Sequence, residues 1–183
     1  MAVCHKSLKR ILMTETAFQT PQGLLTLQRY PIRKSDTLRA WDAADELLIN
    51  YLHDEQVLEQ VMGQPECRVL IFDDQFGALT ASICRAVNAV SKHVIIDVIT
   101  DSLIAESAIT QNLNSNDLQS ECADVGFLDS TSTPADKYDL VIYKLPRNLA
   151  YCGDVMTRLR HCMRADTKII GAAMAKYLPL TAL

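Results

Sequence analysis

A short apolar run followed at once by acids is the feature that most constrains the fold of this chain. Residues 69–72 read Val-Leu-Ile-Phe, and Asp73 and Asp74 come directly after them. A helical pattern begins at Ala78, after a turn whose only glycine is Gly77. A buried strand that leads into a helix is typical of the first half of a parallel β-α-β unit. Ligands in open parallel sheets bind just beyond such strand ends, so residues 73–77 are the first candidate site.

Strand and helix patterns alternate along the rest of the chain. Apolar runs predict strands at 23–30, 69–72, 93–100, 125–128, 138–143 and 168–174. Apolar residues at three- and four-residue steps predict helices at 36–52, 55–62, 78–90, 103–113 and 148–164. From residue 67 onward, this order predicts an α/β fold with a mostly parallel, doubly wound sheet. A last helix is expected from Ala175, although Pro179 interrupts its pattern.

Three segments are expected in the chain. Residues 1–22 show no clear period and end at a Thr-Pro-Gln-Gly turn signal, so we expect a loosely ordered leader. Residues 23–63 form a small strand and helix extension, and residues 64–183 form the α/β domain. The chain stops shortly after the fifth strand expected in that domain, which indicates a fragment of a longer protein.

The first expected helix carries an apolar stripe with one exception. Its N-cap is expected at Ser35 or Asp36, and the stripe contains Trp41, the only tryptophan, which we expect to anchor the core. Asp45 falls on the same stripe. We nevertheless interpret Asp45, like its neighbour Asp42, as a charge on the solvated face.

Composition excludes several functional classes. The net charge is 18 − 22 = −4, which does not indicate a nucleic-acid binder in bulk, although a local basic face is compatible with it. The six cysteines form no C-x-x-C pair and are expected to be reduced thiols of a cytosolic core. The four histidines have no ligand-like spacing, so no metal is expected. No secretion signal or membrane-spanning run is recognisable, which predicts a cytoplasmic protein without a membrane partner.

Two interpretations of the loop after the first buried strand are weak. A phosphate or nucleotide cradle needs several glycines, and the single Gly77 is better explained as a residue that eases the turn from strand to helix. The pair Asp73 and Asp74 also suggests a phosphoacceptor receiver domain. That class needs an aspartate at the end of a later strand, where this chain has Tyr143 and Lys144.

A third interpretation comes from resemblance. The stretches that carry it are Leu-Thr-Leu-Gln-Arg-Tyr-Pro at 25–31, Leu-Arg-Ala-Trp-Asp-Ala-Ala-Asp-Glu at 38–46, Phe-Gly-Ala-Leu at 76–79, Asp-Ser at 101–102 with Asn-Leu at 112–113, Lys-Leu-Pro-Arg-Asn-Leu-Ala at 144–150, and Thr-Lys-Ile-Ile-Gly-Ala at 167–172. With the order of elements, they resemble the amino-terminal domain of bacterial ribosomal RNA guanine-N2 methyltransferases of the RlmG/RsmC type. The second and fifth stretches favour the RlmG branch. The resemblance covers roughly residues 24–176 and implies a Rossmann-like class I methyltransferase fold.

The resemblance implies a non-catalytic role. In that family, a carboxy-terminal domain binds S-adenosylmethionine and performs the chemistry, and the amino-terminal domain is a degenerate copy that supports folding and engages RNA. If Gly77 is aligned with the last glycine of the family's cofactor loop, the other two glycines fall on Asp73 and Gln75, and the loop's acid falls on Ile71. The segment Asp73, Asp74, Gln75, Phe76 and Gly77 is therefore expected to bind no cofactor.

Two further residues of the family's cofactor-binding and catalytic pattern are also missing, which again indicates a non-catalytic domain. The acid that would bind the cofactor's ribose falls on Thr100, and Asp97 lies too early in the strand. The catalytic Asn-Pro-Pro-Phe/Tyr turn falls on Lys144, Leu145, Pro146 and Arg147, where a cation and an aliphatic residue replace the acceptor and the stacking ring. We therefore expect no catalytic residue in this chain.

The resulting expectation is a domain that positions large-subunit ribosomal RNA for a carboxy-terminal catalytic domain. Lys144 and Arg147, with Arg29, Arg33 and Lys34, are the candidate phosphate contacts. One alternative is an active methyltransferase or nucleotide-binding enzyme with an atypical, glycine-poor loop. Another is a dimerisation or scaffold module that binds no RNA.

Overall fold

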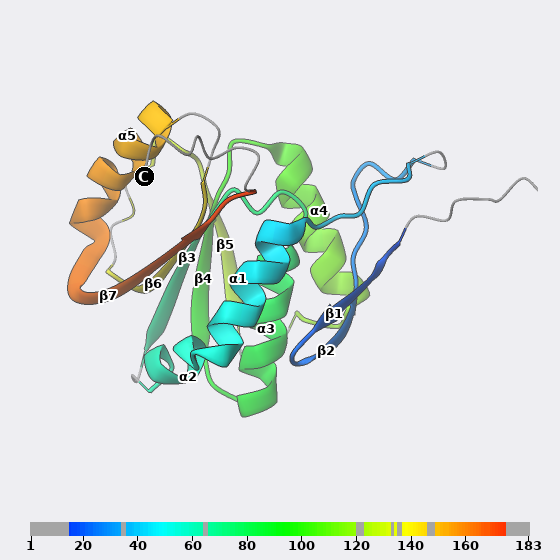
Figure 1. Cartoon of the computed structure of the whole chain (residues 1–183), viewed down its shortest axis with the longest axis horizontal. Coiled ribbons are helices and arrows are strands. Elements are labelled where there is room, and N and C mark those ends of the chain that lie inside the picture. Colours follow the sequence, from blue (N-terminus) through cyan, green and yellow to red (C-terminus); the bar gives the residue numbers. More distant parts are fainter. Residues whose placement is uncertain are drawn as a thin grey trace, which may run out of the picture.

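The structure is a central sheet with helices on both faces and a small hairpin at one side (Figure 1). The computed structural model describes residues 15–33, 36–63, 66–119, 123–132, 134, 137–145 and 149–174. The helix expected from Ala175 lies outside these residues. In the part of the chain described, no helix has both the length and the apolar character needed to cross a bilayer.

Five parallel strands form the central sheet. They are β3 (Cys67–Phe72), β4 (Val94–Ile99), β5 (Ala123–Leu128), β6 (Tyr138–Lys144) and β7 (Met163–Ala172). Their spatial order is β5-β4-β3-β6-β7, and each neighbouring pair is parallel. The chain therefore runs outward from β3 to one edge, returns, and continues from β6 to the other edge. This reversal beside β3 is the switch point of a Rossmann-like, doubly wound sheet, and it confirms the predicted fold class.

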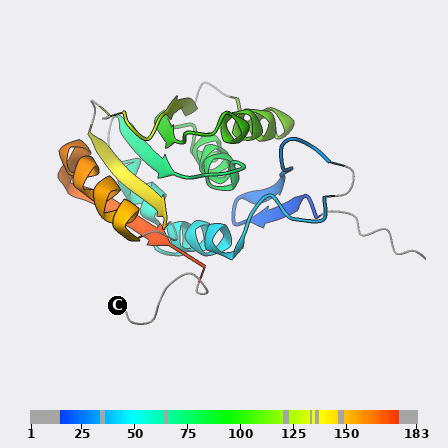
Figure 2. The same ribbon diagram turned by 90° about the horizontal axis from the view of Figure 1, so that it is seen from above.

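The helices divide between the two faces of the sheet. They are α1 (Ala43–Asp54), α2 (Val57–Val61), α3 (Ala78–Val90), α4 (Leu103–Ser115) and α5 (Leu149–Leu159), with a 3₁₀ turn, η1, at Arg160–Cys162. Figure 2 shows α1, α3 and α4 on one side of the sheet and α5 on the other. Two hydrophobic clusters match these layers, since α1, α3 and α4 contribute to the larger cluster and α5 to the smaller one.

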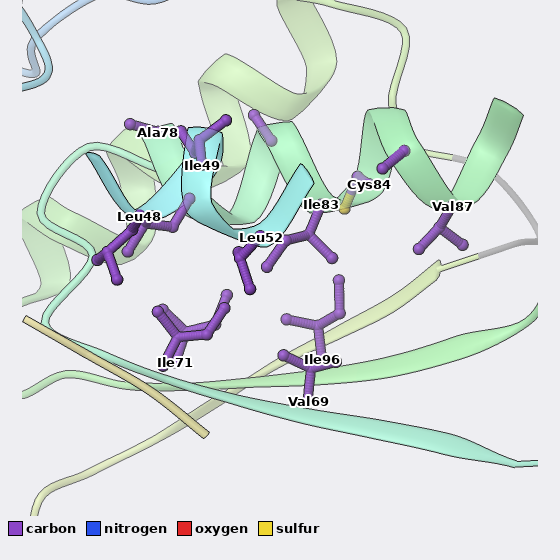
Figure 3. Packing of buried hydrophobic residues seen from close by; sticks show 14 of the residues in the cluster. Leu48, Ile49, Leu52, Val69, Ile71, Ala78, Ile83, Cys84, Val87 and Ile96 are labelled. Carbon is purple, nitrogen blue, oxygen red and sulfur yellow. The ribbon is translucent and has the colours of Figure 1, made fainter. Parts of the chain in front are cut away.

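The larger cluster is formed where α1 and α3 pack on β3 and β4. Figure 3 shows Leu52 of α1 and Ile83 of α3 pointing toward Val69 and Ile71 of β3. The strand residues are fully buried because a parallel sheet is covered on both faces. Cys67, Cys84 and Cys162 are buried free thiols, as expected, and burial raises the pKa of Cys67 and of Cys84 to about 12.

The boundaries differ from those predicted by periodicity mainly in two regions, and the strand predicted at 23–30 ends earlier, at Thr26. The first helix begins at Ala43, not after Ser35 or Asp36, because Asp42 is its N-cap and holds the amides of Ala44 and Asp45. Leu38, which lies within the predicted helix 36–52 but before α1, is 60% exposed. Trp41 is buried, as predicted.

The other difference lies at the far end of the sheet. The predicted helix 148–164 ends at Leu159, and β7 begins at Met163, five residues before the expected strand. The pairing of β6 with β7 is irregular between Tyr138 and Leu140, so β7 contains a bulge that sequence periodicity does not reveal.

A hairpin precedes the α/β layers. It pairs β1 (Ala17–Thr20) with β2 (Gly23–Thr26) in antiparallel fashion. Strand β1 therefore lies within the segment 1–22 that was expected to be a leader, while residues 1–14 lie outside the described chain. Leu25 and Leu27 are fully buried, as their alternation with polar residues predicted.

Asn112 of α4 and Asn116, the C-cap residue that follows α4, hold the end of β2 and the chain just after it. Asn116 accepts a hydrogen bond from the amide of Thr26 at 2.7 Å and donates to its carbonyl at 2.8 Å. Asn112 repeats this arrangement with Gln28, at 2.9 Å for both bonds. Residues four apart share a helix face, and residues two apart share one side of an extended chain, so the two amides act as a short ladder. This ladder attaches the extension to the α/β layers.

Candidate functional site

Asp74 occupies the N-terminus of α3, at the carboxyl edge of the sheet. Its side chain accepts hydrogen bonds from the amide of Gly77 at 3.1 Å, the amide of Thr80 at 2.8 Å and the hydroxyl of Thr80 at 2.7 Å. Asp74 is buried, with 1% of its surface exposed. A helix N-terminus is a natural anion site because its amides point outward and its dipole is positive. Here, the chain supplies that anion itself.

The residues on either side of Asp74 shape the same loop. Asp73 adopts a left-handed conformation, with φ of 58°, and its amide donates to the carbonyl of Ile99 at 3.2 Å. Gly77 has φ of 85°, and a Cβ at this position would lie 3.1 Å from the Cα of Ile109. Gly77 thus permits both the turn and the close packing of α3 on α4, in agreement with its interpretation as a turn residue.

Lys144, at the end of β6, forms ion pairs with the first turn of α1. Its Nζ lies 2.9 Å from Asp45 Oδ1 and 3.4 Å from Asp42 Oδ2. The Lys144 side chain is 13% exposed and the Asp45 side chain only 3%. Asp45 also accepts a hydrogen bond from the Asp42 amide at 2.9 Å, which completes a capping box. The Lys144 ammonium therefore faces carboxylates of the protein, not an open surface for RNA.

These charges change one another's pKa values. Burial raises the pKa of Asp45 to about 6; the positive charge of Lys144 opposes this shift and the negative charge of Asp74 adds to it. Burial alone lowers the pKa of Lys144, but the nearby carboxylates, Asp45 foremost, outweigh it and raise that pKa above its ordinary value. Lys144 is consequently charged at neutral pH and bound within the protein.

Asp45 is the residue that sequence reasoning assigned wrongly. It was interpreted as a solvated charge, but it is 2% exposed and pairs with Lys144. The signal was present, because Asp45 lies on the apolar stripe of its helix. Asp97, by contrast, lies within β4 and accepts a hydrogen bond from the Tyr138 hydroxyl at 2.7 Å. Thr100 directly follows β4, in the place expected for a ribose-binding acid.

The remaining candidate cations lie on the extension. Arg29 forms an ion pair with Asp36 at 3.2 Å, and its guanidinium lies 4.6 Å from the centre of the Phe76 ring. Arg33 is exposed and lines a small cavity of about 130 Å³ with Arg29 and Leu38. Lys34 and Arg147 lie outside the described residues. The structure thus brings Arg29 and Arg33 together, next to the loop that holds Asp74.

A narrow cavity of about 90 Å³ joins these parts. Arg29, Phe76, Asp74, Asp45 and Lys144 are among its lining residues. Its described lining contains three cations, Arg29, Arg39 and Lys144, and three aspartates, Asp42, Asp45 and Asp74, so the charges compensate one another within the protein. Within the described ranges, no group of three or more histidine, cysteine, aspartate or glutamate side chains is arranged to hold a metal ion.

A family model described as the RLMG N-terminal domain matches residues 15–183. Two similar proteins are both called ribosomal RNA large subunit methyltransferase G. The one from Photobacterium profundum is 36% identical over 152 residues, which cover 83% of this chain and 36% of that protein. The one from Pseudomonas aeruginosa is 34% identical over 165 residues, which cover 90% of this chain and 40% of that protein. The chain thus spans 36–40% of the length of these relatives.

The solved structures include a similar chain at low sequence identity. The crystal structure of coclaurine N-methyltransferase bound to N-methylheliamine and SAH has a TM-score of 0.48 and 19% sequence identity. The similarity covers 78% of this chain and 38% of that chain.

Proposed function

The chain belongs to the RLMG N-terminal domain family, and from this membership we propose that it is a non-catalytic domain of a large-subunit ribosomal RNA guanine-N2 methyltransferase. In this proposal, the domain binds and positions ribosomal RNA in the cytoplasm. A carboxy-terminal domain of the parent protein binds S-adenosylmethionine and transfers the methyl group. The proposed boundaries remain those expected from the sequence, with an extension at 23–63 and an α/β domain at 64–183.

The position of Asp74 is the observation that carries the non-catalytic part of the proposal. A cofactor loop must leave backbone amides free and must approach the ligand without side chains in the way. Here, a buried carboxylate already bonds two amides at the α3 N-terminus. Its charge would repel the carboxylate of a methionine moiety. The residues present at this loop therefore do not fit S-adenosylmethionine.

The other two expected losses support the same proposal. Thr100 provides a hydroxyl, not the carboxylate that would accept hydrogen bonds from both ribose hydroxyls. Lys144 is a cation held by Asp45, and it cannot accept a hydrogen bond from a guanine amine. No step of a methyl transfer can be assigned to these side chains.

Arg29 and Arg33 support the RNA part of the proposal. Both lie on the extension and line the same small cavity; Arg29 lies over Phe76 of the loop after β3, and Arg33 is exposed. Phosphate contacts of this kind give affinity without base specificity, which suits a positioning domain. Lys144 is left out of this surface because carboxylates of the protein hold its ammonium.

The test of RNA binding compares Arg33→Ala with a matched variant, Lys92→Ala. Lys92 is also exposed, but it precedes β4 at the opposite, amino edge of the sheet. Affinity for a labelled large-subunit rRNA fragment is measured at several salt concentrations. Each lost phosphate contact reduces the slope of log affinity against log salt by about 0.7–0.9. We expect this reduction for Arg33→Ala alone; equal slopes for wild type and both variants would contradict the proposal.

A further inference from the structure

A second cavity lies at the switch point of the sheet, apart from the narrow one described above. Its volume is about 310 Å³, close to the lower end of the range for small-ligand pockets, about 300–1,000 Å³. Three neighbouring strands end at it: β4, β3 and β6. It is lined by Phe72, Asp73, Ile99, Thr100, Asp101, Ser102, Ser130, Tyr143, Lys144 and Tyr151. Ligands of open parallel sheets bind at this position.

Three aromatic residues are among those that line the cavity. Phe72 and Tyr143 pack edge to face, with ring centres 5.2 Å apart and planes at 89°. Tyr151, in the first turn of α5, also lines the cavity and is 40% exposed. Flat heterocycles stack on such rings, and the contact with one tyrosine is sequence-tolerant because every nucleobase has a π-face.

Carboxylates outnumber cations among the lining residues, and Arg158, a cation beside this wall, is paired with Asp154 and donates to the Ser130 carbonyl. Asp73 and Asp101 contribute carboxylates, and the only cation among the lining residues, Lys144, is already paired with Asp45 and Asp42. Asp101 accepts a hydrogen bond from the Ser130 amide at 2.7 Å, and hydrogen bonds from Ser130 lower the pKa of Asp101. An ionised carboxylate attracts hydrogen-bond donors, such as ribose hydroxyls and the amines of a base.

The hydroxyl groups complete the match with a nucleoside. Thr100, Ser102 and Ser130 are among the residues that line the cavity, and hydroxyls both donate and accept hydrogen bonds. The cavity therefore offers a stacking surface, anionic acceptors and hydroxyls, and it lacks a free cation among its described residues. An uncharged nucleoside fits this combination better than a nucleotide.

We propose that this cavity binds an unstacked nucleoside of single-stranded RNA, with its base against Tyr151 and its donors directed to Asp101. The inference rests on the proposed RNA-positioning function and gives that function a specific contact. It differs from cofactor binding because only a nucleoside is accommodated, while the N-terminus of α3 is closed by Asp74.

The main test compares Tyr151→Ala with Tyr51→Ala in the chain of residues 1–183. Tyr51 is a matched control, because it is 46% exposed on α1 and does not line the cavity. The probe is a fluorescently labelled, ten-nucleotide single-stranded RNA, and circular dichroism checks that each variant is folded. Loss of one stacked base weakens binding by roughly tenfold or more. We expect this loss for Tyr151→Ala, and an affinity within about twofold of wild type for Tyr51→Ala.

A second measurement identifies the source of the nucleoside. Amide resonances of Thr100, Asp101 and Ser102 are followed during titration with the RNA, with free guanosine and with free adenosine. Shifts with the RNA support the inference, and shifts only with free nucleosides contradict RNA as the source. If RNA binds with equal affinity to all variants and leaves these amides unchanged, the cavity inference is wrong and the proposed function stands. If the wild type binds no RNA, both are wrong.

Discussion

At the scale of single residues, Asp74 determines what the carboxyl edge can bind. It makes three hydrogen bonds at the start of α3, two of them to Thr80. A side chain of the protein that accepts hydrogen bonds from helix amides stabilises the fold. It also occupies the place where an external anion would bind. The same residue therefore acts on stability and on ligand exclusion, and its stability role can be measured separately.

Replacing Asp74 by alanine should destabilise the protein by about 1–3 kcal/mol. The loss of a side chain that accepts hydrogen bonds from amides at the start of a helix costs about 1 kcal/mol, as for an N-cap, and the buried Thr80 hydroxyl loses its partner. Urea unfolding of the chain measures the change. The control is Asp54→Ala, at an exposed aspartate in the last turn of α1. An equal, small effect for both variants would contradict the capping role.

The ion pair of Lys144 and Asp45 should show strong coupling. Lys144→Met leaves the Asp45 carboxylate buried without its main counter-charge, which typically costs about 3–5 kcal/mol. The double variant Lys144→Met with Asp45→Leu removes both charges, so its loss should be smaller than the sum of the two single losses. Unfolding free energies of the four proteins test this, and simple additivity would show that the pair is not coupled.

The raised pKa of Asp45 predicts a pH dependence with a definite sign. The pKa is 3.8 for the ordinary group and about 6 in the folded protein. Between these values, the folded state holds more protons than the unfolded state, so this group's contribution to stability falls as pH rises from about 4 to 6. Between about pH 4 and 6, the stability of the wild type should fall relative to that of Asp45→Asn. Above about pH 7, the difference in stability between the two proteins should stay constant. Urea midpoints at several pH values check it; curves parallel from about pH 4 upward would contradict it.

At the scale of elements, the hydrogen bonds between α4 and the extension join two segments that are far apart in the sequence. Asn112 is buried and donates to the carbonyl of Phe76 at 2.7 Å, in addition to its two bonds with Gln28. One amide therefore connects α4, the extension and the loop that contains Asp74. This arrangement positions Arg29, which follows Gln28 and lies over the Phe76 ring.

Asn112→Ala should detach the extension locally and destabilise the protein by about 2–4 kcal/mol. It leaves part-buried backbone groups of Gln28 and Phe76 without their partner, and a group left unsatisfied in this way costs up to about 1–3 kcal/mol. Hydrogen exchange at the Gln28 amide should increase more than exchange in β3. The control, Asn114→Ala, changes an exposed residue of the same helix and should alter neither property.

The sequence predicted elements well where one period dominates. Residues 78–90 are helical as predicted, because their apolar positions face the sheet, and the buried runs of β3 and β6 appear where apolar residues cluster. The start of α1 was missed because the cap lies in the Asp42 side chain, and periodicity does not register caps. The early start of β7 was missed because its bulge depends on pairing with β6.

The candidate site was predictable only in part. The order of strands and helices along the chain tells which loops follow the carboxyl ends of the strands. The loop with Asp73 and Asp74 was therefore located correctly at the carboxyl edge. The partners of Lys144 were not predictable, because the α1 residues that pair with it are distant in sequence and became neighbours only through packing. Asp45 on an apolar stripe was the one local signal of that contact.

At the scale of the whole molecule, the chain has the layers of a Rossmann-like enzyme and a carboxyl edge occupied by its own charges. We propose that this domain does not bind the cofactor and that it binds and positions RNA. The narrow cavity is lined by compensating aspartates and cations, and the larger one suits an uncharged nucleoside. Both features agree with a supporting domain within a longer methyltransferase.

Calorimetric titration of this chain with S-adenosylmethionine and S-adenosylhomocysteine tests that claim most directly. The account predicts no saturable binding below millimolar ligand, because Asp74 closes the α3 N-terminus. A cofactor-binding methyltransferase measured in the same buffer serves as the positive control. One-to-one binding at micromolar ligand would overturn this proposal, and the chain would then be assayed as an enzyme with an atypical, glycine-poor loop.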